Sequence, residues 1–284
     1  MKKHVILAYG VVCYLIFLGT FLYAIGFLGN FIVSKSIDSG EAGSTTQAII
    51  INVILLALFA VQHSVMARPG FKKSLTKIVP EPMERSTYVF LSSALLILLF
   101  WQWRPMTAVI WNVAGQPVAY IFWAVFAAGW ALVLLATFLI DHFDLFGLRQ
   151  VWLYWQGKDY ESKPFGTPSL YKYMRHPLYL GWFLAFWATP SMTAGHLLFA
   201  VVTTAYILVA IQLEERDLVK RFGEDYIEYK KTTPMIFPFP KQKPAQTEPA
   251  SNSEQASSDV EEPASDSEQP PSDQEEPASD SEQP

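Results

Sequence analysis

The chain is poor in cysteine and in charge. Only one of its 284 residues is a cysteine, Cys13, so no disulfide can form within the chain and a cysteine-based metal site is excluded. Charged residues make up 17% of the chain and hydrophobic residues 51%. Charge is almost absent from several segments long enough to cross a bilayer. These absences exclude a disulfide framework and indicate an integral membrane protein.

Five apolar regions carry most of the hydrophobic residues. A bilayer core needs ~20 apolar residues per helix, and the regions are 4–33, 46–66, 86–103, 117–140 and 178–213. We predict an all-α integral membrane protein with five or six transmembrane helices. The first region is too long for the apolar part of a signal peptide and lacks a clean cleavage site. We therefore interpret it as an uncleaved span.

The C-terminal residues 241–284 lack aromatic side chains and differ in composition from the rest. They contain 12 acidic residues and 2 lysines, which leaves 14 acidic and 19 basic residues in residues 1–240. A motif repeats every 14 residues, as "EPASNSEQ" at Glu248 and "EPASDSEQ" at Glu262 and Glu276. Such a composition cannot bury a core. We predict a membrane domain over 1–240 and a disordered acidic repeat tail over 241–284.

The basic residues predict an orientation. They gather in segments 67–85 and 141–176, whereas the loops 34–45 and 104–116 carry only one basic residue each. Basic loops favour the cytoplasmic side. Segment 216–231 carries five more basic residues and is expected on the same side. We predict a protein of the bacterial inner membrane whose active site, N-terminus and tail are cytoplasmic.

Residues 178–213 therefore have to enter the membrane and return. Pro190 and Gly195 suit a turn in the middle of this region. The first arm, 178–188, would reach only ~16 Å as a helix, about half a bilayer. Either the preceding residues extend it or it is a re-entrant arm. We predict a C-terminal helical hairpin with a cytoplasmic cofactor-binding face.

This hairpin brings two polar stretches to one membrane surface. Arg175, His176 and Pro177 precede its first arm, and Glu214 and Glu215 follow its second. Adjacent carboxylates at the lipid boundary are costly unless they face a polar site. Apolar residues at a spacing of three to four then predict an amphipathic helix along the interface: Leu218, Phe222, Tyr226 and Tyr229.

Two motifs within these stretches resemble a known superfamily. "RHPLYLG" (175–181) and "EERDLVKRFGEDYIEYKKTTP" (214–234) resemble the S-adenosylmethionine-binding motifs of the isoprenylcysteine carboxyl methyltransferase-like membrane methyltransferases. Upstream, "AVQHSVMARPGFK" (60–72), "ERSTYVF" (84–90) and "IDHFDLFGLRQ" (140–150) are similar to its NnrU-related branch. The members most similar along the whole chain convert methanethiol to dimethyl sulfide. The resemblance implies an S-adenosylmethionine-dependent S-methyltransferase that acts on this small volatile thiol at the lipid bilayer.

The resemblance also implies a set of cofactor-binding residues: Arg175, His176, Pro177, Tyr179, Gly181, Glu214, Glu215 and Tyr226. A guanidinium binds a carboxylate well through two parallel hydrogen bonds, so Arg175 suits the carboxylate of the cofactor. Glu214 and Glu215 suit its ammonium group or its ribose hydroxyls. Pro177 and Gly181 would let backbone groups approach it closely.

Four residues are candidates for the catalytic base: His63, His142, His176 and Glu214. His63 lies in a polar stretch at the end of the second span, where polar residues are functional by default. It is expected to face residues 141–144. His63, Asp141, His142 and Asp144 could in principle ligate a metal, but no tight ligand spacing supports this, so no metal is predicted.

The sequence leaves the methyl acceptor open. Another thiol, a prenylcysteine carboxylate or a lipid amine would suit the same cofactor, and the lipid acceptors need a wide opening towards the bilayer. A non-enzymatic NnrU-like membrane factor or a small-solute carrier is the alternative from another class, and it has no reason to bind S-adenosylmethionine. No nucleic-acid partner is predicted, and the oligomeric state stays open.

Overall fold

The structure, a computed structural model, describes residues 2–41 and 43–238. The predicted acidic tail lies outside these residues, so its disorder stays a prediction. In chain order the elements are α1 (Lys2–Gly29), α2 (Thr45–Ala67), α3 (Pro69–Leu75), a 3₁₀ turn (Glu81–Met83), α4 (Glu84–Gln102), β1 (Val109–Asn112), α5 (Ala119–Ile140), α6 (His142–Leu145), α7 (Leu148–Gln156), a second 3₁₀ turn (Ser169–Lys172), α8 (Pro177–Trp187), β2 (Ser191–Thr193), α9 (Ala194–Phe222) and α10 (Glu224–Thr232).

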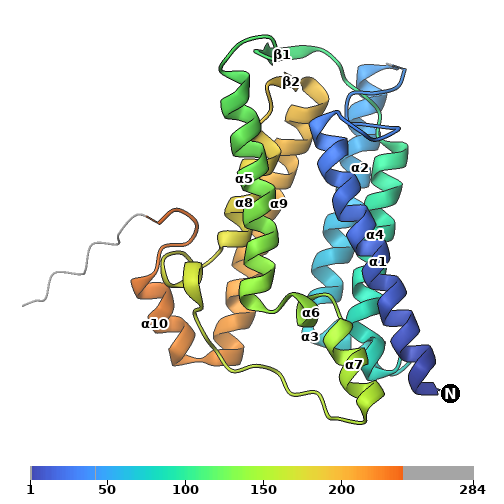
Figure 1. The fold of residues 1–284 in the computed structure, drawn as a ribbon, viewed down its shortest axis with the longest axis vertical. Coiled ribbons are helices and arrows are strands. Elements are labelled where there is room, and N and C mark those ends of the chain that lie inside the picture. The colour runs from blue at the N-terminus through green and yellow to red at the C-terminus, as the bar shows by residue number, and fades with distance from the viewer. Residues whose placement is uncertain (1, 42, 239–284) are drawn as a thin grey trace, which may run out of the picture. The chain divides into compact units, whose positions relative to one another are not determined.

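Five of the described helices are long and apolar enough to cross a membrane: α1, α2, α4 with the turn before it, α5 and α9. The prediction of a helical membrane protein is confirmed. Helices α1, α2, α4 and α5 run in alternating directions, and α9 runs in the same direction as α5 because α8 returns the chain between them (Figure 1). As a result β1 and β2 lie at one end of the bundle, and α3, α6, α7 and α10 lie at the other.

The core of the bundle is apolar and rich in aromatic side chains. Phe27, Leu99, Trp103 and Ile211 are fully buried in it, and they come from α1, the end of α4 and α9. Many large apolar side chains instead point outwards, such as Ile54 on α2. Outward apolar side chains are what a lipid-facing surface requires, because lipid tails solvate them as well as a core does.

Helices α5 and α8 pack closely through two glycines. A Cβ atom built on Gly129 would lie 2.5 Å from the backbone nitrogen of Ala185 and 2.9 Å from the carbonyl oxygen of Gly181. A Cβ atom on Gly181 would lie 2.8 Å from the backbone nitrogen of Val133. Small residues let membrane helices approach each other to backbone contact. The sequence analysis predicted that Gly181 lets the cofactor approach the backbone closely. In the structure Gly181 lets α5 approach closely.

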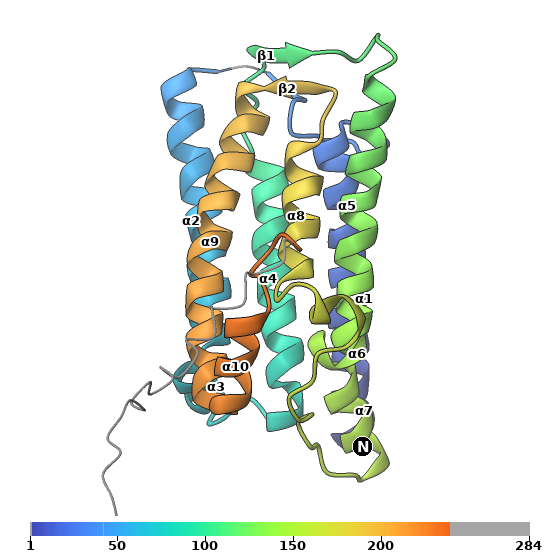
Figure 2. The same cartoon turned by 90° about the vertical axis from the view of Figure 1, so that its left-hand side faces the viewer.

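The predicted C-terminal hairpin is formed by α8, β2 and α9. Figure 2 shows α8 between α5 and α9. From Ala194 to Glu215, α9 rises about 31 Å, which is the thickness of a bilayer core. Helix α8 has 11 residues, and residues 188–190 lead from it to β2. The first arm therefore reaches the end of the bundle at which α9 begins.

Two features differ from the sequence-based expectation. A two-stranded antiparallel sheet joins the hairpin turn to the loop after α4, with Val109 opposite Thr193 and Asn112 opposite Ser191. The amphipathic helix predicted over Leu218–Tyr229 is not one helix. Gly223, at φ +58°, ends α9 and begins the separate helix α10. A positive φ favours glycine, which explains the break at this residue.

Candidate functional site

The beginning of α8 is attached to the chain after α10. The backbone N–H groups of Arg175 and His176 donate to the carbonyl oxygens of Pro234 and Met235, at 2.9 and 3.0 Å. Pro177 occupies the first turn of α8, where its missing N–H costs nothing. The local sequence thus fixes both the start of α8 and the return of the chain beside it.

Arg175 and Glu215 form a buried ion pair across the hairpin. The Nε atom of Arg175 donates to Oε1 of Glu215 at 2.7 Å, and the two residues are 8% and 3% exposed. The Nη1 atom of Arg175 donates to the carbonyl oxygens of Lys230 and Thr233, at 3.1 and 2.6 Å. The guanidinium predicted to bind the cofactor carboxylate is therefore engaged by the protein.

Glu215 has two further partners. Nε2 of His176 lies 3.1 Å from Oε1, and Nζ of Lys230 lies 2.8 Å from Oε2. One carboxylate thus joins the N-terminal end of α8, the C-terminal part of α9 and α10. The prediction that Arg175, His176 and the two glutamates meet at one surface agrees with this geometry.

Glu214 faces a different environment from its neighbour. It is half-buried, and its Oε2 accepts a hydrogen bond of 2.8 Å from the hydroxyl of Tyr179. The Tyr171 hydroxyl is also within electrostatic range of Glu214, and it is buried without a hydrogen-bond partner among the described residues. Burial, followed by the Glu214 charge, raises the pKa of Tyr171 above its usual range.

His63 lies in a polar network between α2 and α4. Its ring forms two hydrogen bonds. The Tyr88 hydroxyl is 2.9 Å from Nε2, and the Ser92 hydroxyl is 3.2 Å from Nδ1. Ser64 bonds the Tyr206 hydroxyl of α9 at 3.2 Å. Tyr88 and Tyr206 are within electrostatic range of Glu214. The sequence analysis missed both tyrosines.

His142 belongs to a separate, structural network. Nδ1 is 2.8 Å from the Thr137 hydroxyl and Nε2 is 2.8 Å from the Tyr14 hydroxyl, so both ring nitrogens are engaged. Burial lowers the pKa of His142, opposed by the nearby Asp141. Arg149 and Lys163 form ion pairs with Asp141.

The predicted grouping of His63 with segment 141–144 is wrong, because His63 contacts α4 while His142 contacts α1 and α5. Among residues 2–41 and 43–238, no three His, Cys, Asp or Glu side chains gather as metal ligands.

Tyr226 is 2% exposed. Its ring packs between Phe165 and Tyr229. Burial raises the pKa of the neighbouring Tyr229 to about 12. Tyr226 therefore packs α10 against the loop before α8, and this aromatic contact positions the other residues of the site.

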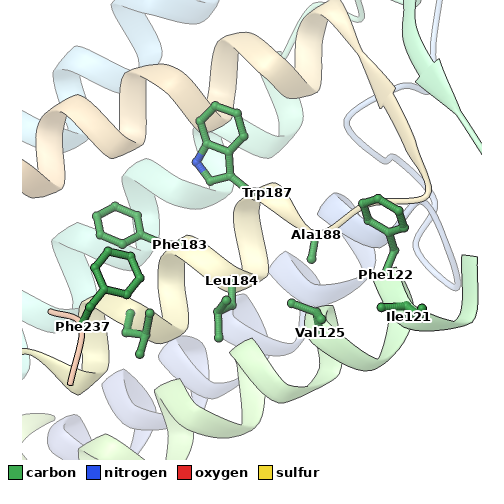
Figure 3. A pocket seen from close by; sticks show the side chains of 9 residues that line it. Ile121, Phe122, Val125, Phe183, Leu184, Trp187, Ala188 and Phe237 are labelled. Carbon is green, nitrogen blue, oxygen red and sulfur yellow. The ribbon is translucent and has the colours of Figure 1, made fainter. Parts of the chain in front are cut away.

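The surface also carries an apolar groove, away from the polar residues. It has a volume of about 350 Å³ between α5 and α8, and Figure 3 shows its lining. All nine lining side chains are apolar, and Phe183, Trp187 and Phe237 also line a second groove of about 590 Å³ against α9. The second groove contains one side-chain hydroxyl, that of Thr204, which accepts a hydrogen bond of 2.9 Å from Trp187.

These features define a class of protein: a helical multi-span membrane protein with a polar site built on the hairpin of α8 and α9. The chain belongs to the NnrU protein family, whose model matches residues 51–233. It is 55% identical to methanethiol S-methyltransferase of Crocosphaera subtropica, covering 84% of this chain and 94% of the relative. It is 52% identical to methanethiol S-methyltransferase of Mycobacterium tuberculosis, covering 84% and 98%.

A more distant relative carries a different name. The chain is 30% identical to nurim of Danio rerio, covering 62% of this chain and 66% of the relative. No solved structure matches the chain. The resemblance predicted from the two motifs is confirmed by the family and by the relatives named methanethiol S-methyltransferase.

Proposed function

We propose that this protein transfers a methyl group from S-adenosylmethionine to methanethiol and releases dimethyl sulfide. Relatives that are 52–55% identical over most of the chain bear the name of this activity. The observation that carries the proposal is the hairpin, which brings the start of α8 to Glu214 and Glu215 at the end of α9. An S-methyltransferase needs a methyl donor, and this polar site suits one with charged groups.

The residues of the site fit S-adenosylmethionine in two respects. Glu214 is a half-buried carboxylate that can hold the cofactor's ammonium group. The Tyr171 hydroxyl is a buried donor that lacks an acceptor among the described residues, and a ribose hydroxyl would supply one. Tyr179 orients Glu214 through its hydrogen bond. Arg175, His176, Pro177, Gly181, Glu215 and Tyr226 hold these groups in place.

When bound, S-adenosylmethionine would supply a methyl carbon for the thiolate to attack in line, and its sulfonium sulfur would leave as a neutral thioether. The protein has to take one proton from the thiol and exclude water, since neutralising opposite charges is favoured in a dry site. His142 bonds Tyr14 of α1 and Thr137 of α5 in a separate network, and His176 is held at Glu215. Glu214 is assigned to the ammonium group. We therefore assign the proton to His63, because Tyr88, which bonds its ring, is within electrostatic range of Glu214.

The proposed activity predicts a volatile product. Membranes containing the protein, supplied with methyl-labelled S-adenosylmethionine and methanethiol, should release labelled dimethyl sulfide into the headspace. Glu214→Gln should reduce this release tenfold or more at limiting cofactor, because a hydrogen bond to a charged group is worth about 1.5–3 kcal/mol. Glu228→Gln, at an exposed position on α10, is the matched control and should behave as the wild type. Labelling of larger thiols or lipids instead would overturn the choice of acceptor.

We also propose that the α3–α10 end of the bundle faces the bacterial cytoplasm, since most Lys and Arg residues lie at this end. In a Cys13→Ser background, a cysteine at exposed Ser74 should be protected from an impermeant thiol reagent in intact cells, and a cysteine at exposed Asn112 should react. The opposite labelling pattern would show that the orientation is reversed and that the site faces away from the cytoplasmic cofactor pool.

A further inference from the structure

Arg68 is fixed at the junction of α2 and α3. Pro69 follows it, and a residue before proline is disfavoured in the helical conformation. Arg68 accordingly ends α2 with an extended backbone, at φ −73° and ψ 141°. Its Nε atom donates to the carbonyl oxygen of Ser64, one turn earlier on α2, at 3.1 Å. The proposed function uses only His63 from the stretch 60–72, to which Arg68 also belongs.

The guanidinium of Arg68 joins α2 to α9. Its Nη1 atom donates to the carbonyl oxygen of Leu213 at 3.3 Å and to Oδ2 of Asp217 at 2.6 Å. Figure 2 shows α2 beside α9. Leu213 and Asp217 are four residues apart, so they mark the two ends of one helical turn. Arg68 therefore bonds this turn of α9 at both ends.

The same turn carries both glutamates of the candidate site. Consecutive residues point about 100° apart on a helix, so Leu213 and Asp217 share one face and Glu215 points about 200° away from Leu213. Glu215 is paired with Arg175 on α8. Glu214 lies between these two faces and bonds the Tyr179 hydroxyl at 2.8 Å. The direction of Glu214 is therefore fixed from one side by α2 and from the other by α8.

The exposure of the Arg68–Asp217 pair distinguishes it from the buried pair of Arg175 and Glu215. The side chains of Arg68 and Asp217 are 34% and 31% exposed. An ion pair in contact with solvent adds little to stability. A guanidinium with acceptors on two helices nevertheless fixes their relative rotation, because its donors lie in one plane. The main effect of Arg68 should therefore be on the position of Glu214.

We propose that Arg68 is a positioning residue of the methyl-transfer site, which acts by holding the turn of α9 that carries Glu214. The inference rests on the proposed function, in which Glu214 binds the ammonium group of S-adenosylmethionine. A carboxylate turned away from this group loses a charge-assisted hydrogen bond, so the affinity for the cofactor falls. The hydrogen bond to the ammonium group is present before and during methyl transfer. Its loss therefore raises KM for the cofactor and leaves kcat unchanged.

The test is a double-mutant cycle between Arg68 and Glu214. S-adenosylmethionine is titrated by calorimetry into full-length protein in a neutral detergent. Arg68→Gln should weaken binding about tenfold, and Glu214→Gln by at least as much. The double variant should bind within about twofold of Glu214→Gln alone, because Arg68 acts through that carboxylate. Losses that multiply, to roughly 100-fold, would show that Arg68 acts independently of Glu214 and would overturn the inference.

The matched control is Arg216→Gln. It removes an exposed positive charge from the same turn of α9 and should keep the affinity of the wild type. Arg68→Lys keeps the charge but lacks the planar guanidinium, so it should keep part of the affinity. Asp217→Asn breaks the ion pair from the other side and keeps the bond to Leu213, so it should weaken binding by a smaller factor. This variant tests the inference even if Arg68→Gln does not fold.

Two further measurements separate positioning from a merely structural role. The melting temperature of Arg68→Gln should fall by about 4 °C or less, as expected for an exposed ion pair. The headspace assay should give a higher KM for the cofactor at unchanged kcat. A lower kcat at unchanged KM would mean that Arg68 acts through His63 on α2, and a large fall in melting temperature at unchanged affinity would mean that it only holds the bundle. Either result overturns the inference.

The outcomes also separate this inference from the proposed function. A wild type that does not bind S-adenosylmethionine contradicts the proposed function, and the inference fails with it. A Glu214→Gln variant with wild-type affinity contradicts the role of Glu214 and has the same consequence. A wild type that binds, a Glu214→Gln variant that binds weakly and an Arg68→Gln variant with wild-type affinity overturn the inference alone.

Discussion

Replacing Arg175 with alanine is expected to destabilise the protein by about 3–5 kcal/mol, the cost of removing one partner of a buried ion pair. The substitution leaves Glu215, 3% exposed, without the partner at the shortest distance, 2.7 Å. It also leaves the carbonyl oxygens of Lys230 and Thr233 without a donor. The chain after α10 should then detach from α8. Arg175→Lys should restore only part of the stability, since an ammonium cannot direct hydrogen bonds to three acceptors in the planar arrangement of a guanidinium.

Cys13 provides the measurement. It is the only cysteine of the chain and it is buried in α1. A thiol-reactive fluorogenic dye therefore reports thermal unfolding in detergent without further labelling. Arg175→Ala should lower the melting temperature by roughly 6 °C or more. Arg216→Ala is the control, because it removes an exposed arginine at the position after Glu215 on α9. It should change the melting temperature little. Equal melting temperatures for Arg175→Ala and wild type would show that the ion pair does not hold the hairpin.

Replacing Gly129 or Gly181 with alanine is expected to cost about 1–3 kcal/mol or more, the range seen when a packed interior is overfilled. At Gly129 the new Cβ atom would meet backbone atoms of α8 at 2.5 and 2.9 Å. A side chain can move aside by changing its rotamer, but a helix backbone cannot, so α5 and α8 would have to separate. Because α8 begins with His176 and Pro177, this separation should also weaken cofactor binding.

The control for the glycine substitutions lies in α1. A Cβ atom on Gly19 would meet no other atom within 4 Å. Gly19→Ala should therefore be neutral or stabilise the protein by up to about 1 kcal/mol, because alanine favours helix more than glycine. The dye assay with Cys13 should rank the three variants with Gly19→Ala highest. Comparable melting temperatures at all three positions would mean that α5 and α8 are not in backbone contact.

Much of the fold could be predicted from the sequence because membrane spans are recognised by length and composition alone. The apolar regions located every long helix, and Pro190 and Gly195 located the turn of the hairpin. The β1–β2 pair could not be predicted, since its strands have only four and three residues and depend on partners about 80 positions apart. The break at Gly223 was missed because the apolar spacing continues across it.

The sequence predicted which residues lie close together at the site, but not which side chains are in contact. The hairpin required Arg175 to lie near a glutamate, but consecutive residues point about 100° apart on a helix, so only one of the two could reach it. Which one depends on the rotation of α9, and the structure selects Glu215. The carbonyl oxygens of Lys230 and Thr233 could not be predicted as partners of Arg175, because every residue has a backbone carbonyl. Tyr88 was missed because tyrosines near the ends of spans are common as interface anchors. Tyr206 was missed because it lies in the middle of α9, within an apolar stretch.

The shortness of α8 has a consequence for how the protein is made. Its 11 residues fall well below the ~20 that a stable single span needs, and the charged Arg175 lies two residues before it. During synthesis α8 would therefore have little tendency to enter the bilayer before α9 has emerged from the ribosome. The two helices should insert together as a pair, and Arg175 would meet Glu215 only at that stage. The polar site would thus be completed in the last step of membrane insertion, when the ribosome has already synthesised the rest of the bundle.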